Sequence, residues 1–206
     1  MFKTIFPLSS NQSIFAVTTL TTMKKNYTNI LLATVLVLLA ASSRVIFNEA
    51  HIWNIAPIAA LGLFSGAVVK DRRFAFLLPL LAQFSADVYF QFFTSTQGFY
   101  NISQFFTYGG LIAATIIGFR MNRINAVKVL GFTLASSTAF FLISNFGVWL
   151  QGWYGMTFSG LVNTYVLAVP FYKNTLIGDL TGSVILFGMY HLLQNVVVPR
   201  LAKSNV

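Results

Sequence analysis

Long apolar runs dominate this chain, and they limit what it can fold into. A helix of about 20 apolar residues crosses the roughly 30 Å of hydrocarbon in a bilayer. Six stretches meet or approach that length, at residues 28–48, 53–69, 73–93, 103–120, 125–150 and 173–197. The sequence therefore predicts an all-α fold, an integral membrane bundle of six transmembrane helices within one domain, 28–197.

Composition supports the membrane class. The 206 residues are 56% hydrophobic and 8% charged, and the mean hydropathy is +0.74. Such a chain is too apolar to keep the surface of a soluble domain hydrated, so its first partner is the lipid bilayer. The net charge of +9 does not indicate nucleic acid, because the cations are dispersed at the ends of the apolar runs. The chain has no cysteine, which excludes disulfides and thiolate chemistry.

The basic residues are distributed on one side of the predicted bundle. Eleven of the thirteen lie before the first span, after the second, after the fourth, or at the end of the chain: Lys3, Lys24, Lys25, Lys70, Arg72, Arg73, Arg120, Arg123, Lys128, Arg200 and Lys203. The loops around 92–101 and 151–160 carry no charge. Because Lys and Arg are retained on the cytoplasmic side, we expect a multi-pass protein of the cell inner (cytoplasmic) membrane with both termini cytoplasmic. Two residues, Arg44 and Lys173, break the pattern.

The two ends of the chain differ from its centre. Residues 1–22 are polar and rich in Thr and Ser, and Met23 with two lysines resembles a start of translation. We expect 1–27 to be a disordered or mis-annotated leader and 198–206 to be a cytoplasmic basic tail. Residues 24–43 imitate a secretory signal, but apolar character resumes at Val45, which favours an uncleaved first helix.

Two segments depart from a regular span. The second span is short and contains Pro57, which predicts tilting or partial unwinding near its outer end. Residues 160–172 are apolar, but Pro170 and Lys173 interrupt them. That length suits a short interfacial or re-entrant segment between helices 5 and 6.

Small residues recur at intervals that allow close helix packing. The pairs are Ala56/Ala60, Gly62/Gly66 and Gly178/Gly182. Such spacing lets two helix backbones approach, either inside the bundle or against a partner helix. We favour internal packing, and docking remains the alternative.

Polar groups from four spans meet at a similar depth. Charged residues inside spans are costly and usually face a bundle interior or an aqueous cavity. Counting about 1.5 Å per helical residue brings Arg44, Asp87, Asn145 and Asp179 to the outer half of the membrane. The candidate substrate-binding set adds residues near the outer mouth: Glu49, His51, Asn54, Trp149, Lys173 and Asn174.

Two interpretations of this cluster stay open. It could bind a small polar solute from outside, with the carboxylates accepting hydrogen bonds from its donor groups and Arg44 or Lys173 binding its anionic group. Alternatively, Arg44 pairs with Asp87 or Asp179 only to neutralise charge and lock the bundle.

The sequence does not indicate an enzyme. It contains no HExxH, GxSxG or Walker motif, so we predict no catalytic residues and no cofactor. Paired metal-ligand spacing is also absent, and no metal is predicted. A metal-dependent enzyme would require three or more of Glu49, His51, Asp87 and Asp179 within ligand distance of one another.

Several segments resemble a known group of sequences. They are residues 54–66, 73–79, 85–87, 145–149 and 168–179. Together they are similar to a family of uncharacterised bacterial six-span proteins, over roughly residues 28–195. That family is in turn similar in size, span number and topology to the substrate-binding S components of energy-coupling factor transporters, which capture vitamins or metal ions from outside.

The resemblance implies a function. The outer polar cluster would be the solute pocket, the segment between spans 5 and 6 its gate, and the small residues of spans 1 and 2 a docking face for a membrane coupling subunit. Separate ATPases would supply energy. We therefore expect a membrane-embedded solute-binding subunit of a transporter. The alternative is a non-transporting membrane scaffold or assembly subunit whose polar groups pair fully and leave no cavity.

Overall fold

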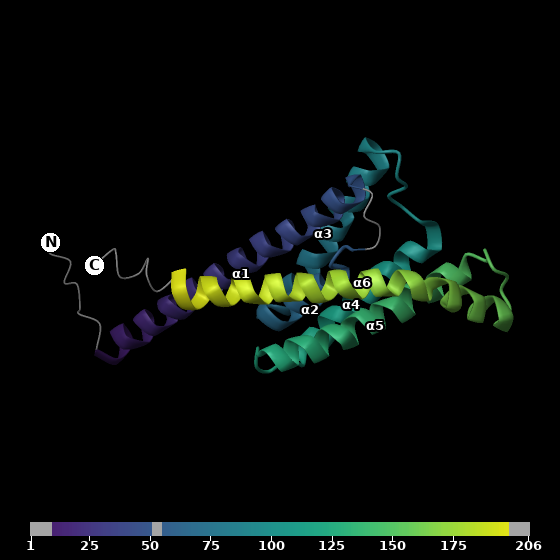
Figure 1. The fold of residues 1–206 in the computed structure, drawn as a ribbon. Helices are drawn as coiled ribbons and strands as arrows, with labels where there is room; N and C mark the ends of the chain where they lie inside the picture. The colour runs from purple at the N-terminus through teal and green to yellow at the C-terminus, as the bar shows by residue number, and fades with distance from the viewer. Residues whose placement is uncertain (1–9, 51–54, 198–206) are drawn as a thin grey trace.

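The computed structural model describes residues 10–50 and 55–197, which form an all-α bundle (Figure 1). Five of the helices, α1 from Ile30 onward and α3 to α6, are long and apolar enough to cross a membrane. The predicted all-α bundle of six helices is confirmed, and five of the six predicted spans are long and apolar enough to cross a membrane. The helices are α1 (Ser10–Glu49), α2 (Ile58–Val68), α3 (Arg72–Phe93), α4 (Asn101–Phe119), α5 (Ala126–Leu150) and α6 (Phe158–Leu192), followed by a π-helical turn at Leu193–Val197.

Helix α2 is the shortest of the six. Its 11 residues extend about 16 Å, which is too short to cross a bilayer alone. Proline disfavours helical geometry in the residue before it, so Pro57 prevents extension toward Ala56 and occupies the N-cap position. Almost every residue of α2 is buried, as expected for a helix that is apolar on all sides. The span predicted at 53–69 is therefore a short core helix.

Glycines bring α2 and α4 into backbone contact. A Cβ atom at Gly66 would collide with the carbonyl oxygen of Thr115, and one at Gly118 would collide with the carbonyl oxygen of Leu63. Gly62 likewise faces the backbone of α4. Internal packing thus explains the small residues of α2, and the implied docking of a coupling subunit on them is wrong because they are buried.

Helix α6 is continuous from Phe158 to Leu192. Residues 160–172 form its first part, so the predicted separate interfacial or re-entrant segment is wrong. The Thr157 side chain caps this part by accepting a hydrogen bond from the Gly160 N–H at 3.1 Å. The Tyr165 hydroxyl donates to the carbonyl of Leu142 on α5 at 2.7 Å. These contacts hold the segment in the helix although Pro170 lies inside it.

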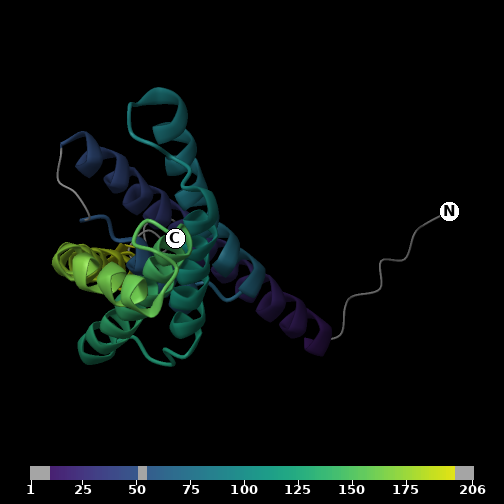
Figure 2. The same cartoon turned by 90° about the vertical axis from the view of Figure 1, so that its right-hand side faces the viewer.

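Helix α1 is longer than the first predicted span. It begins at Ser10 and includes residues 10–27, which we expected to belong to a disordered or mis-annotated leader. No Pro or Gly occurs between Ser10 and Glu49, so no residue in this stretch breaks the helix. The first part of α1 extends beyond the other helices and away from the bundle (Figure 2). The predicted basic tail, 198–206, lies outside the described residues.

The loops gather at two opposite ends of the bundle. The guanidinium of Arg72, at the start of α3, lies 5.5 Å from the ring centre of Phe119, at the end of α4. The two basic loops therefore share one end, as the charge pattern predicts, and we call it the basic end. At the opposite end, the Gln151 side chain donates to the carbonyl of Tyr100 at 2.6 Å. The candidate site lies toward this opposite end.

Candidate functional site

Asp87 of α3 is the centre of a buried polar network. Its carboxylate, 1% exposed, accepts hydrogen bonds from Arg44 Nη1 on α1 at 2.5 Å and from the Tyr108 hydroxyl on α4 at 2.9 Å. The side-chain amides of Gln104 and Gln83 also donate to it, at 2.5 Å and 3.1 Å. A carboxylate with this many donors is well compensated for its burial.

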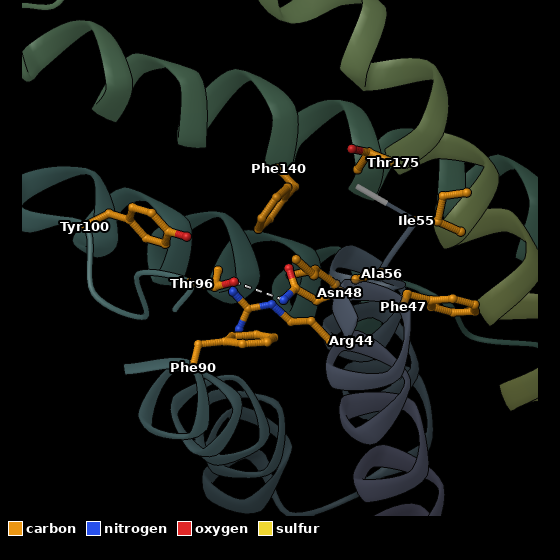
Figure 3. Close-up of a pocket in the computed structure, with 11 residues that line it drawn as sticks. Arg44, Phe47, Asn48, Ile55, Ala56, Phe90, Thr96, Tyr100, Phe140 and Thr175 are labelled. Carbon is orange, nitrogen blue, oxygen red and sulfur yellow. Dashed lines mark hydrogen bonds between the residues drawn. The ribbon is translucent and has the colours of Figure 1, made fainter. Parts of the chain in front are cut away.

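Arg44 is held in place from two sides. Its ion pair with Asp87 uses one guanidinium nitrogen, and its guanidinium carbon lies 5.0 Å from the ring centre of Phe90. A guanidinium has five N–H donors, so several remain beyond the one used by Asp87. The side chain is 18% exposed, and Figure 3 shows it reaching into a pocket with Thr96 and Tyr100 nearby. Arg44 is thus fixed, with donors available to a further group.

The space beside Arg44 is a cavity with two adjoining lobes, which we call the polar cavity. The lobes measure about 240 and 430 Å³. Both are lined by Arg44, Ile58, Tyr100, Phe140 and Thr175. The smaller lobe adds Phe47, Asn48, Ile55, Ala56, Phe90 and Thr96, and the larger adds Gln83, Gln104, Thr107, Phe141, Ser144, Asn145, Ala168, Phe171 and Tyr172.

The polar groups of the larger lobe offer mainly acceptor oxygens. The single O–H groups of Ser144, Thr107 and Thr175 bond to carbonyls of their own helices at 3.1 to 3.4 Å, and one N–H of Asn145 does the same at 2.8 Å. Their lone pairs remain available to a solute. Arg44 supplies charged N–H donors on the other side of the cavity.

Tyr100, in the loop before α4, adds a second donor. Burial raises the pKa of its phenol, the charge of Asp87 raises it further, and the charge of Arg44 partly opposes these effects. An ordinary Tyr pKa is about 10, so this hydroxyl is protonated at neutral pH. In Figure 3 its ring extends toward the middle of the pocket. Tyr100 can therefore donate a hydrogen bond alongside Arg44.

Asp179 lies outside the polar cavity and stabilises the start of α2. It is completely buried on α6, outside both lobes, and accepts a hydrogen bond from the Ala60 N–H at 3.0 Å. That N–H belongs to the first turn of α2, whose N-cap residue Pro57 makes no side-chain cap. Gly178 and Gly182 pack directly on Ile55 and Pro57, which allows this approach. Asp179 thus caps α2 from a neighbouring helix.

A small polar seam surrounds that cap. Thr133 of α5 donates to the Ser183 hydroxyl of α6 at 2.8 Å, and Ser137 lies beside Asp179. The second oxygen of Asp179 and the hydroxyls of Ser136 and Ser137 are buried without a hydrogen bond of good geometry. None of these seam residues lines either lobe of the polar cavity.

The capping role predicts different effects of two substitutions. Asp179→Ala removes the acceptor and is expected to lower the free energy of unfolding by about 1–2 kcal/mol. Asp179→Asn keeps an acceptor oxygen and is expected to cost clearly less. Denaturant unfolding in detergent, followed by circular dichroism, measures both. Equal losses in the two variants would contradict the capping role.

The other predicted residues occupy varied positions. Asn145 lines the larger lobe with Arg44, and Asp87 lies directly behind Arg44. Lys173 is exposed on α6, between two lining residues but outside the cavity, and Asn174 is half-buried outside it. Glu49 is exposed at the end of α1, while Trp149 donates to the carbonyl of Thr157 at 3.2 Å. His51 and Asn54 lie outside the described residues.

Sequence reasoning missed the uncharged partners of Asp87. Gln83 lies one helical turn before Asp87, and Gln104 lies one turn before Tyr108, so each pair shares a helix face. This spacing was available in the sequence.

Metal-ligating side chains do not gather in the part of the chain that the structure describes. No group of three or more His, Asp or Glu residues occurs there. The approach of Glu49, Asp87 and Asp179 that a metal-dependent enzyme would need is not seen among these residues.

Comparisons with known proteins place the chain in one family. No curated protein and no solved structure matches it. A family of unknown function (DUF6580) matches residues 24–201, which covers every helix from α2 to α6 and most of α1. The chain is therefore a multi-span membrane protein that belongs to the DUF6580 family.

Proposed function

We propose that this protein is a membrane-embedded solute-binding subunit of a transporter, and that it binds a small polar solute in the polar cavity. The observation that carries the proposal is Arg44, a charged side chain inside a span, fixed by Asp87 and Phe90 with donors left over in a cavity. Intramembrane charges of this kind usually face an aqueous path or a ligand. The resemblance to S components implies the same location for a solute.

The cavity also supports solute binding over a scaffold function. In a scaffold, we would expect the polar groups to be fully paired around a sealed interior. Asp87 is fully paired, but Arg44 keeps unused donors, and two lobes remain open beside it. Solute binding accounts for the pair and for the space together.

The charge pattern supports a direction of capture. The polar cavity is lined near the end opposite the basic loops, by Tyr100 and Thr96 of the uncharged 3–4 loop. If the basic end is cytoplasmic, the solute enters from outside. Release inward requires an energy source, and the chain has no nucleotide-binding motif of its own. A coupling subunit and ATPases are the partners that this function needs.

A cavity-filling substitution tests the proposal. Thr175→Trp places a large side chain where both lobes meet, and it is expected to abolish solute binding. Lys173→Trp, two residues away on the exposed face of α6, is the matched control and should bind as the wild type does. Thermal-shift titration of the purified protein with vitamins, amino acids and nucleobases measures binding. Failure of every solute to stabilise the wild type, with no small molecule co-purifying in mass spectrometry, would overturn the proposal.

A further inference from the structure

The charge of the polar cavity is already balanced by the protein. Among the described lining residues Arg44 alone is charged, and its cation is neutralised by Asp87 directly behind it. The other charged groups nearby, Glu49 and Lys173, are exposed and line neither lobe. The cavity thus presents the donors of a cation without an excess positive charge.

An anionic solute would disturb this balance. A carboxylate bound to Arg44 would place two negative charges, its own and that of Asp87, against a single guanidinium in a site of low dielectric. Burying a charge without its own counter-charge is costly. A neutral carbonyl group can accept the same hydrogen bonds from Arg44 and Tyr100 and leaves the net charge of the site at zero.

The other lining residues of the cavity indicate the shape and the donor groups of the solute. Aromatic rings of Tyr100, Phe140, Phe141, Phe171 and Tyr172 line the larger lobe, and the centres of Phe141 and Tyr172 lie 4.6 Å apart. Aromatic walls favour a flat ring packed against them. The acceptor oxygens of Asn145 and its neighbours suit N–H or O–H groups on the solute.

Building on the solute-binding function above, we propose that the solute is an uncharged ring compound that carries a carbonyl acceptor and at least one N–H or O–H donor. Arg44 donates hydrogen bonds to the solute while Asp87 balances its charge, so Arg44 does not favour an anion. Selectivity against carboxylates follows from Asp87, which does not itself contact the solute.

Two probes of nearly the same shape test this charge preference. Benzamide is an uncharged ring with a carbonyl and an N–H donor, and benzoate is its anionic counterpart at neutral pH. We expect benzamide to bind the full-length protein at least about tenfold tighter than benzoate, measured by ligand-detected NMR in detergent micelles. Equal or tighter binding of benzoate would overturn the charge argument and leave solute binding intact. Binding of neither probe would count against the proposed function itself.

The preference should depend on Asp87. Asp87→Asn removes the counter-charge and is expected to reverse the preference in favour of benzoate. If that variant does not fold, Asn145→Lys adds a second cation to the larger lobe and should shift the preference in the same direction. Lys173→Gln lies outside the cavity and should leave the benzamide-to-benzoate ratio unchanged. An unchanged ratio in the folded Asp87→Asn or Asn145→Lys variant would overturn the proposal.

Discussion

Asp87→Ala is expected to lower the free energy of unfolding by about 3–5 kcal/mol. The substitution removes the counter-charge of Arg44 and the shared acceptor of Gln83, Gln104 and Tyr108. Breaking a buried ion pair from one side costs more than the pair itself contributes, because it leaves the other charge unpaired. The network also joins α1, α3 and α4, so the loss should loosen α1 from the bundle.

Equilibrium unfolding in mixed micelles measures this effect. Glu49→Ala is the matched control, because Glu49 is an exposed acidic residue at the end of α1, and its substitution should change stability by less than about 0.5 kcal/mol. Asp87→Asn should fall between the two, since it keeps a polar side chain at the centre of the network. Stability of the Asp87→Ala variant equal to that of the control would contradict the network as described.

Gly66→Ala is the second substitution with a large expected effect. The added methyl group would meet the carbonyl of Thr115 and the backbone of Gly118. A backbone cannot rotate away as a side chain can, so α2 must move from α4. Overpacking of this kind costs about 1–3 kcal/mol, and the loss here should reach the upper part of that range.

Gly131→Ala provides the control on α5. A Cβ atom there would meet no atom within 4 Å beyond its chain neighbours and the adjacent backbone of α5, and alanine is favoured over glycine in a helix by about 1 kcal/mol. This variant should therefore be as stable as the wild type or slightly more so. Thermal denaturation of both variants in the same detergent compares them. A Gly66→Ala variant that matches Gly131→Ala would contradict the close packing of α2 on α4.

Much of the fold follows from the sequence because one physical requirement dominates it. Long apolar runs must be helical in a bilayer, and this predicts the number of helices and most of their positions. The loops after α2 and α4 follow from their basic residues. The prediction for residues 160–172 is wrong because Pro170 lies inside α6 without ending the helix. The capping of α6 by Thr157 and its contacts with α5 are tertiary features that periodicity does not reveal.

The site was predictable in part. Depth counting brought Arg44, Asp87 and Asn145 together, and these residues do lie in or behind one cavity. Asp179 has a similar depth but caps α2. Depth counting could not predict this, because it does not specify the direction of a side chain around its helix. The aromatic lining could not be predicted either, since the chain has 22 Phe residues and most of its helices present some to lipid.

The central claim is that a polar cavity at Arg44 opens on the side opposite the basic loops, and cysteine labelling tests it most directly. The chain contains no cysteine, so Thr175→Cys introduces a single thiol on the wall shared by both lobes. The fully buried Ser137→Cys is the control. With a membrane-impermeant thiol reagent added to intact cells, we predict labelling of the Thr175→Cys variant, slowed by benzamide, and none of the Ser137→Cys variant. Absence of labelling at position 175 from outside, with labelling only in inverted vesicles or not at all, would contradict the claim.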